Sequence, residues 1–269
     1  MVGELICARV LVVDDDEMSR ELLGLLLQAK GYTVESADSG EAALALLERG
    51  GPLPDLVLAD VQMPGTTGAE LASELRRVCG PDTLLLAMSG SRPAKKLVAG
   101  FDGFLLKPFK MEAIAVALAG RSIRSATAAH APGSENASKP GMKDVVHDLP
   151  VVPGETSGLP VLNEKIFQQL SSSVPGKQLL EMYAMCVNDT RQRIATMRRL
   201  VDEHDGAKFV REAHSIKGGC GMLGATELHG MAAELEKNGL DAGAAAEVNS
   251  LDELSAACDR LERMLGSRV

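Results

Sequence analysis

The sequence contains no tryptophan, few aromatic residues and no excess of basic residues. Aromatic residues make up 3% of the 269 residues, so a base-stacking platform for nucleic acid is not expected. The 28 Lys and Arg residues against 37 Asp and Glu residues give a net charge of −9. A chain with this balance is poorly suited to holding DNA, RNA or an anionic lipid surface. We therefore expect no nucleic-acid partner.

Paired cysteine motifs and long apolar runs are also missing. The five cysteines lack CxxC spacing, which argues against a zinc site and favours buried thiols in a reducing compartment. No apolar run approaches the ~18 residues that a membrane span needs. The apolar stretch at 5–13 contains Arg9 and continues into three aspartates, a pattern unlike a signal peptide. We expect a cytoplasmic protein with no membrane insertion.

Residues 1–120 alternate short apolar runs with amphipathic stretches of helical spacing. Buried strands that alternate with helices are typical of a parallel sheet covered on both faces. We therefore predict a doubly wound (βα)5 domain. The predicted strands are 10–13, 33–36, 56–59, 84–88 and 103–106, and the predicted helices are 18–30, 40–49, 68–79, 93–100 and 111–120.

The composition changes twice after this domain. Residues 121–158 are rich in Pro, Gly, Ala and Ser, which predicts a flexible linker. Residues 159–269 contain no strand-like run, and their periodic stretches predict an antiparallel four-helix bundle. Its helices are expected at 176–203, 205–222, 225–238 and 244–265. The predicted fold class is α/β followed by all-α.

Polar side chains follow the predicted strands of the first domain. Asp14 and Asp15 follow the first strand, Asp60 ends the third, Ser89 follows the fourth and Lys107 follows the fifth. The carboxyl ends of parallel strands meet at one edge of a sheet, so we expect these groups to converge. Oxygen ligands favour a hard cation such as Mg²⁺. A metal ion, an ammonium and a hydroxyl at one edge suit phosphoryl transfer.

Four stretches make residues 8–120 resemble a response-regulator receiver domain. They are VVDDD at 12–16, DVQMPGTTG at 60–68, MSG at 88–90 and LKPF at 106–109. The resemblance implies a flavodoxin-like fold. The segment from Ser89 to Phe104 is about one helical turn shorter than is usual in that family, so a stunted helix is expected at 93–100.

The resemblance also implies roles for individual residues. Asp60 would be the phosphoacceptor, and Ser89 and Lys107 would contact the phosphoryl group. Phe104 would fill the aromatic switch position. The implied Mg²⁺ ligands are Asp14, Asp15, Asp60 and the backbone carbonyl of Gln62.

One stretch of the bundle, AHSIKGGCGMLG at 213–224, sets a histidine apart from the apolar stripe. At 100° per residue His214 shares a side with Lys217, Gly218 and Gly221 and is expected to face solvent. Lys217 lies three residues on, so its ammonium can reach an anion on the imidazole. Glycines inside a helix cost about 1 kcal/mol each. Either the helix ends at Lys217, or the missing side chains at Gly218 and Gly221 let another protein approach His214.

His214, Lys217, Gly218 and Gly224 resemble the pattern of a histidine phosphotransfer (HPt) domain, which would cover residues 160–267. The resemblance implies that His214 is the phosphorylated residue. The remaining histidines are expected to be surface or capping groups. These are His130, His147, His204 and His229.

The sequence shows no ATP-binding glycine-rich loop and no basic recognition helix, so neither a phosphoryl source nor an output is evident. We predict an intermediate of a multistep phosphorelay. A sensor histidine kinase would phosphorylate Asp60, His214 would receive the group, and a separate response regulator would take it. The chain would not be an enzyme, apart from Mg²⁺-dependent phosphorylation and dephosphorylation of its own receiver. Two alternatives stay open: a phosphate sink, and a phosphorylation-controlled adaptor whose bundle only docks proteins.

Overall fold

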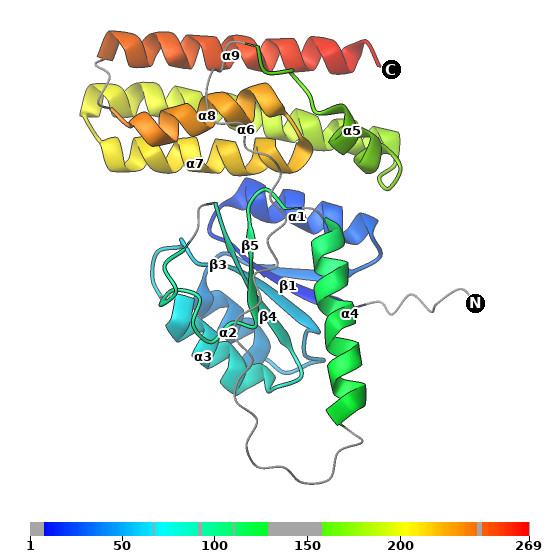
Figure 1. The fold of residues 1–269 in the computed structure, drawn as a ribbon. Helices are drawn as coiled ribbons and strands as arrows, with labels where there is room; N and C mark the ends of the chain where they lie inside the picture. Colours follow the sequence, from blue (N-terminus) through cyan, green and yellow to red (C-terminus); the bar gives the residue numbers. More distant parts are fainter. Residues whose placement is uncertain are drawn as a thin grey trace. The chain divides into compact units, whose positions relative to one another are not determined.

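The structure, a computed structural model, describes residues 8–66, 68–90, 93–109, 111–128, 158–240 and 244–268. The chain divides between residues 149 and 150 into two compact units, an α/β unit and a helical unit (Figure 1). Both halves of the predicted fold class are confirmed.

A parallel five-stranded sheet forms the centre of the first unit. The strands are β1 (Arg9–Val13), β2 (Thr33–Ala37), β3 (Leu56–Asp60), β4 (Leu84–Ser89) and β5 (Gly103–Leu106). Their order is β2-β1-β3-β4-β5, and every neighbouring pair is parallel. This is the flavodoxin-like order, in which the direction of winding reverses beside β1. The buried runs of Val and Leu predicted these strands to within two residues at either end.

Helices cover both faces of the sheet (Figure 1). They are α1 (Glu17–Ala29), α2 (Gly40–Glu48), α3 (Gly68–Cys79) and α4 (Met111–Ala128). Alternate strand residues such as Leu11, Val57 and Leu85 join the core cluster formed with α2 and α3. Asp16 caps the start of α1 by accepting a hydrogen bond from the backbone N–H of Ser19. That cap fixes where the loop after β1 ends.

The helix predicted at 93–100 is not present: residues 93–100 form turns instead. Val98 and Phe101 are nevertheless buried, so this short segment covers the sheet without helical structure. It lies close to the start of α3, because a Cβ on Gly68 would sit 2.2 Å from the carbonyl oxygen of Leu97. Burial of a few apolar side chains and a close backbone approach replace the helix.

Helix α4 is longer than predicted. It continues to Ala128, eight residues beyond the predicted end at Gly120 and into the predicted linker. Residues 121–128 contain no proline or glycine to stop it, and Pro132 comes only later. The rest of the predicted linker, residues 129–157, lies outside the described residues.

The second unit consists of helices. They are α5 (Glu164–Ser171), α6 (Gly176–Glu203), α7 (Gly206–Leu223), α8 (Thr226–Asn238) and α9 (Ala244–Gly266). The last four are the predicted bundle helices, and α5 is an additional short helix capped by Asn163. Tyr183 and Phe209 are fully buried in its core, and the Tyr183 hydroxyl donates to the carbonyl of Leu223 at 2.7 Å.

Helix α7 runs without a break through the glycine-rich stretch. It ends at Gly224, which has a φ of 70° and donates its N–H back to the last turn. A Cβ there would lie 2.8 Å from Cβ of Ile166, so both conformation and space require glycine. The interpretation that the helix ends at Lys217 is therefore wrong.

The cysteines in the described residues are buried and reduced. They are Cys79, Cys186, Cys220 and Cys258. Cys186 and Cys220 face each other at 3.6 Å between sulfur atoms without forming a disulfide. Within the described ranges, no helix is long and apolar enough to cross a membrane.

Candidate functional site

The carboxyl edge of the sheet collects the predicted polar residues. Asp14 comes directly after β1, Asp60 is the last residue of β3 and Ser89 is the last residue of β4. Lys107 comes directly after β5, and its N–H donates to the carbonyl of Ser89 at 2.7 Å. Because the strands are parallel, these four residues lie on the same edge of the sheet, which we call the rim.

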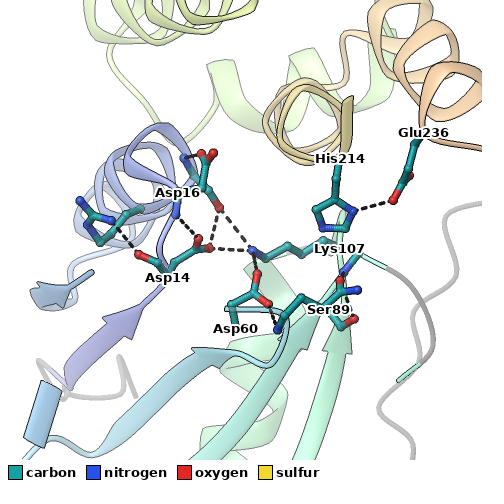
Figure 2. A network of polar contacts seen from close by, with 11 residues as sticks. Asp14, Asp16, Asp60, Ser89, Lys107, His214 and Glu236 are labelled. Atoms are coloured by element: carbon teal, nitrogen blue, oxygen red, sulfur yellow. Dashed lines mark hydrogen bonds and ion pairs between the residues drawn. The ribbon is translucent and has the colours of Figure 1, made fainter. Parts of the chain in front are cut away.

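Lys107 joins two of the carboxylates in a buried ion-pair cluster (Figure 2). Its Nζ lies 2.6 Å from Oδ2 of Asp14 and 2.6 Å from Oδ2 of Asp60. Asp14, Asp60 and Lys107 are only 1%, 5% and 7% exposed. Burial alone lowers the pKa of Lys107, but the charges and hydrogen bonds of the two carboxylates outweigh it and raise the pKa. Lys107 is therefore a cation throughout the physiological pH range.

Backbone groups orient the two carboxylates from the other side. Oδ1 of Asp14 accepts from the N–H of Asp16 at 3.0 Å, and Oδ1 of Asp60 accepts from the N–H of Gln62 at 2.7 Å. The hydroxyl of Ser19, on the first turn of α1, donates to Oδ2 of Asp14 at 2.8 Å. Ser19 is buried in this cluster and was not predicted, because a serine beside buried leucines on a helix gives no distinguishing sequence signal.

Gln62 and Ser89 lie at the same rim. The Gln62 side-chain Oε1 accepts from the Ser89 hydroxyl at 3.1 Å and from the N–H of Gly90 at 3.2 Å. The prediction used only the backbone carbonyl of Gln62, so its side-chain contact with the loop after β4 is new. Phe104 is buried and belongs to the core cluster that also contains Val98 and Phe101.

The structure brings two of the three predicted carboxylates, Asp14 and Asp60, into contact with one group. Among the described residues, no three His, Cys, Asp or Glu side chains are arranged around one metal position. Asp14 and Asp60 meet at the Lys107 ammonium, which supplies the positive charge between them, and Asp15 is exposed. The donors at this rim are oxygen atoms only, and this chemistry fits a hard cation such as Mg²⁺.

The helical unit has its own polar cluster, centred on His214 of α7. Its Nδ1 lies 2.6 Å from Oε1 of Glu236 on α8 (Figure 2). The other carboxylate oxygen, Oε2, pairs with the Lys217 ammonium. Burial raises the pKa of Glu236, but hydrogen bonds from His214 and Lys217 outweigh it, so the pKa is lowered. Because Nδ1–H donates to a carboxylate, the lone pair of the neutral imidazole lies on Nε2.

The surface around His214 differs from the prediction in two respects. Its side chain is 22% exposed rather than solvent-facing, because Glu236 covers the Nδ1 side. Gly218 is half-buried, and a Cβ added to it would meet no atom of the described residues within 4 Å. Gly221 is buried, so its assignment to the approach surface is wrong. Only Gly218 of the predicted pair offers open space beside the histidine.

Comparison with known families decides what the two units are. Residues 10–119 match the model of the response regulator receiver domain, and residues 181–265 match the model of the Hpt domain. The chain contains a response regulator receiver domain and, after it, an Hpt domain. The family resemblance inferred from the sequence motifs is confirmed for both units.

Individual relatives match different lengths of this chain. The virulence sensor protein BvgS of Bordetella parapertussis is 29% identical over 265 residues, which cover 93% of this chain and 20% of BvgS. Response regulator MprA of Mycolicibacterium vanbaalenii is 40% identical over 108 residues, or 39% of this chain and 46% of MprA. The chain thus spans less than half the length of these curated relatives. The solved structure of response regulator TrrA from Thermotoga maritima, a complex with Mg(2+)-BeF, is 31% identical and covers 42% of this chain and 98% of TrrA, with a TM-score of 0.38.

Two further residues of the Hpt domain belong to the His214 cluster and were not assigned to it from sequence. Glu236 bridges His214 and Lys217, and His229 contacts the backbone carbonyl of Lys217 at 2.9 Å through Nδ1. They lie seven residues apart on α8 and therefore share a face. That spacing becomes informative once α8 is known to face α7.

Proposed function

We propose that the chain is an intermediate of a multistep phosphorelay, in which Asp60 of the receiver accepts a phosphoryl group and His214 of the Hpt domain carries it. One observation supports this most strongly. His214 has an oriented imidazole with Nδ1 held by Glu236, on the same chain as a buried aspartate that is paired with a lysine. The partners would be a sensor histidine kinase and a separate response regulator, in the cytoplasm.

The transfer step follows from the two sites. Nε2 of His214 attacks the phosphorus of the Asp60 acyl phosphate, so that the Nε2–P bond forms and the P–O bond to Asp60 breaks. The electron pair of the broken bond returns to the Asp60 carboxylate. The imidazole gains positive charge as Nε2 bonds to phosphorus, and the carboxylate of Glu236 stabilises this charge through Nδ1–H. The reverse step has the same balance.

In the receiver, the Lys107 ammonium would exchange the free Asp60 carboxylate for a phosphoryl oxygen, and the Ser89 hydroxyl would donate to another. Asp14, Asp15, Asp60 and the carbonyl of Gln62 would hold Mg²⁺. When bound, the metal ion supplies charge neutralisation at the phosphoryl oxygens. The chain would otherwise catalyse no reaction beyond its own phosphorylation and dephosphorylation.

In a phosphate sink, the same chemistry would carry phosphoryl groups from His214 to Asp60. The phosphoaspartate would then be hydrolysed. The adaptor alternative does not use His214. It would leave the pairing of Glu236 with both His214 and Lys217 without a purpose, so the relay is favoured.

The test uses the full chain and acetyl phosphate as donor, with and without EDTA. Phosphoaspartate is hydrolysed by alkali, whereas phosphohistidine survives alkali and is lost in acid. We expect the wild type to acquire an alkali-stable label that His214→Gln and Asp60→Asn both lack, and EDTA to suppress labelling of Asp60. A wild-type protein with only alkali-labile label would rule out the relay and leave the adaptor.

A further inference from the structure

His229 contacts the backbone of the phosphoacceptor helix rather than any side chain of the cluster. Its Nδ1 lies 2.9 Å from the carbonyl oxygen of Lys217, an acceptor, so the ring carries its proton on Nδ1. The side chain is half-buried at the start of α8. A side chain that donates to a main-chain carbonyl of a neighbouring helix fixes the position of one helix along the other.

Only Gly224 and Ala225 separate α7 from α8, so Lys217 and His229 lie near the same end of the helix pair. Lys217 lies six residues before the last residue of α7, and His229 lies three residues after the first residue of α8. In an α-helix the carbonyl of residue i points at the N–H of residue i+4. The carbonyl of Lys217 therefore points at the N–H of Gly221, and the His229 ring that bonds to this carbonyl approaches α7 at the level of Gly221. The burial of Gly221 agrees with this placement.

His229 and Glu236 attach the same face of α8 to α7 at two levels. At one level Glu236 holds the side chains of His214 and Lys217, and at the other His229 holds the backbone of Lys217. They are seven residues apart, or about 10 Å along the helix axis. Loss of either contact removes one of these two polar attachments and leaves the buried apolar side chains of α8 and the other contact to position the helix.

We propose that His229 is a positioning residue of the Hpt domain: it fixes α8 on the carbonyl of Lys217 so that Glu236 stays on Nδ1 of His214, and Gly221 is a glycine because its position must admit the His229 ring. The inference rests on the proposed function of His214. Burial lowers the pKa of His229, and the hydrogen bond to Lys217 opposes that shift only in part. The ring therefore stays neutral at pH 7 and adds no positive charge beside Lys217.

The first experiment compares His229→Asn with His229→Leu. The side-chain amide of Asn can place an N–H where Nδ1 stood, whereas Leu fills similar space without a donor. Both are made in full-length Asp60→Asn protein, so that phosphoramidate labels His214 directly and ammonia leaves as the Nε2–P bond forms. We expect Leu to slow labelling about fivefold, equivalent to about 1 kcal/mol, and Asn to stay within about twofold of the parent. Asn is the poorer helix former, so its advantage over Leu cannot come from helix propensity.

A second readout does not depend on phosphorylation. The ¹⁵N chemical shifts of the His214 imidazole report which nitrogen carries the proton. We expect the Nδ1–H form in the wild type and His229→Asn, and a mixture of tautomers in His229→Leu. An unchanged His214 tautomer in His229→Leu would overturn the positioning role. Absence of any label in the Asp60→Asn parent would instead count against the proposed function, and the two failures are thus distinct.

The role of Gly221 is tested by a double-mutant cycle with Gly218→Ala as matched control. The readout is hydrogen exchange of the α7 amides in the full chain. We expect Gly218→Ala to slow exchange because alanine is the better helix former and its Cβ meets no described atom. Gly221→Ala should speed exchange in the wild type and much less in His229→Ser, where the ring is gone. Equal effects of Gly221→Ala in both backgrounds would show that the glycine does not serve His229.

Discussion

Replacing Glu236 with glutamine removes the charge between His214 and Lys217 while keeping the shape of the side chain. Glu236 accepts from Nδ1 of His214 at 2.6 Å and from the Lys217 ammonium, and its side chain is 21% exposed. The amide of glutamine has one acceptor oxygen, so it can keep one of the two contacts. The remaining partner, either the Lys217 ammonium or the His214 imidazole as it gains positive charge, then faces an N–H group.

The expected loss follows from these contacts. A hydrogen bond to a charged group is worth about 1.5–3 kcal/mol, and a neutral one about half as much. Losing one charge-assisted contact and weakening the other gives a loss of roughly 2 kcal/mol in the transition state, where the imidazole is most positive. That corresponds to a roughly 30-fold slower phosphorylation of His214.

The assay is labelling of His214 by phosphoramidate in the full-length Asp60→Asn protein, followed by mass spectrometry. Glu234→Gln is the matched control, since it removes the same charge two residues away on α8. We expect a roughly 30-fold effect for Glu236→Gln and less than twofold for Glu234→Gln. Equal rates in the two variants would refute the argument that the Glu236 carboxylate stabilises charge on the ring.

Three further outcomes are expected. Lys107→Met should lower the free energy of unfolding of the receiver, measured in urea, by about 3–5 kcal/mol, because two buried carboxylates lose their cation. An unchanged midpoint of urea unfolding would mean that water replaces the ammonium. Gly218→Gln should slow transfer from Asp60 to His214, because a bulky side chain obstructs the approach of a protein domain. Labelling of His214 by the small donor phosphoramidate should stay within about twofold of the parent. Equal slowing of both reactions would place the defect in the histidine itself. The Hpt domain should lose stability as the pH falls below about 6.5, because burial lowers the pKa of His229 in the folded state and the unfolded chain therefore binds more protons. Lys217 lowers and Glu236 raises that pKa, and His229→Asn should flatten the slope of urea stability between pH 6.5 and pH 5.

The strands and the rim of the receiver could be predicted because they depend on local pattern. An apolar run buried on both faces is a strand, and in a parallel sheet the residue after it lies at a known edge. The positions of Asp14, Asp60 and Lys107 could therefore be predicted without knowing how the helices pack. Asp15 comes one residue after Asp14 and is exposed, and its role as a Mg²⁺ ligand stays a prediction.

Other features depend on packing that a single chain segment does not encode. In place of the helix expected at 93–100, the segment brings Leu97 close to Gly68, and a contact with so distant a segment has no local sequence signal. Glu236 and His229 join the site only through the rotation of α8 about its own axis. The periodicity of α8 gave its buried face but not which polar residues flank the contact with α7.

In the proposed relay, the two acceptors need partners of opposite charge, and each site has one in place. Asp60 is an anion that must accept a second anionic group, and the Lys107 ammonium at 2.6 Å offsets the repulsion. The His214 imidazole gains positive charge as Nε2 bonds to phosphorus, and the Glu236 carboxylate at 2.6 Å offsets that charge. Each acceptor therefore has a counter-charge in place on this chain before the phosphoryl group arrives.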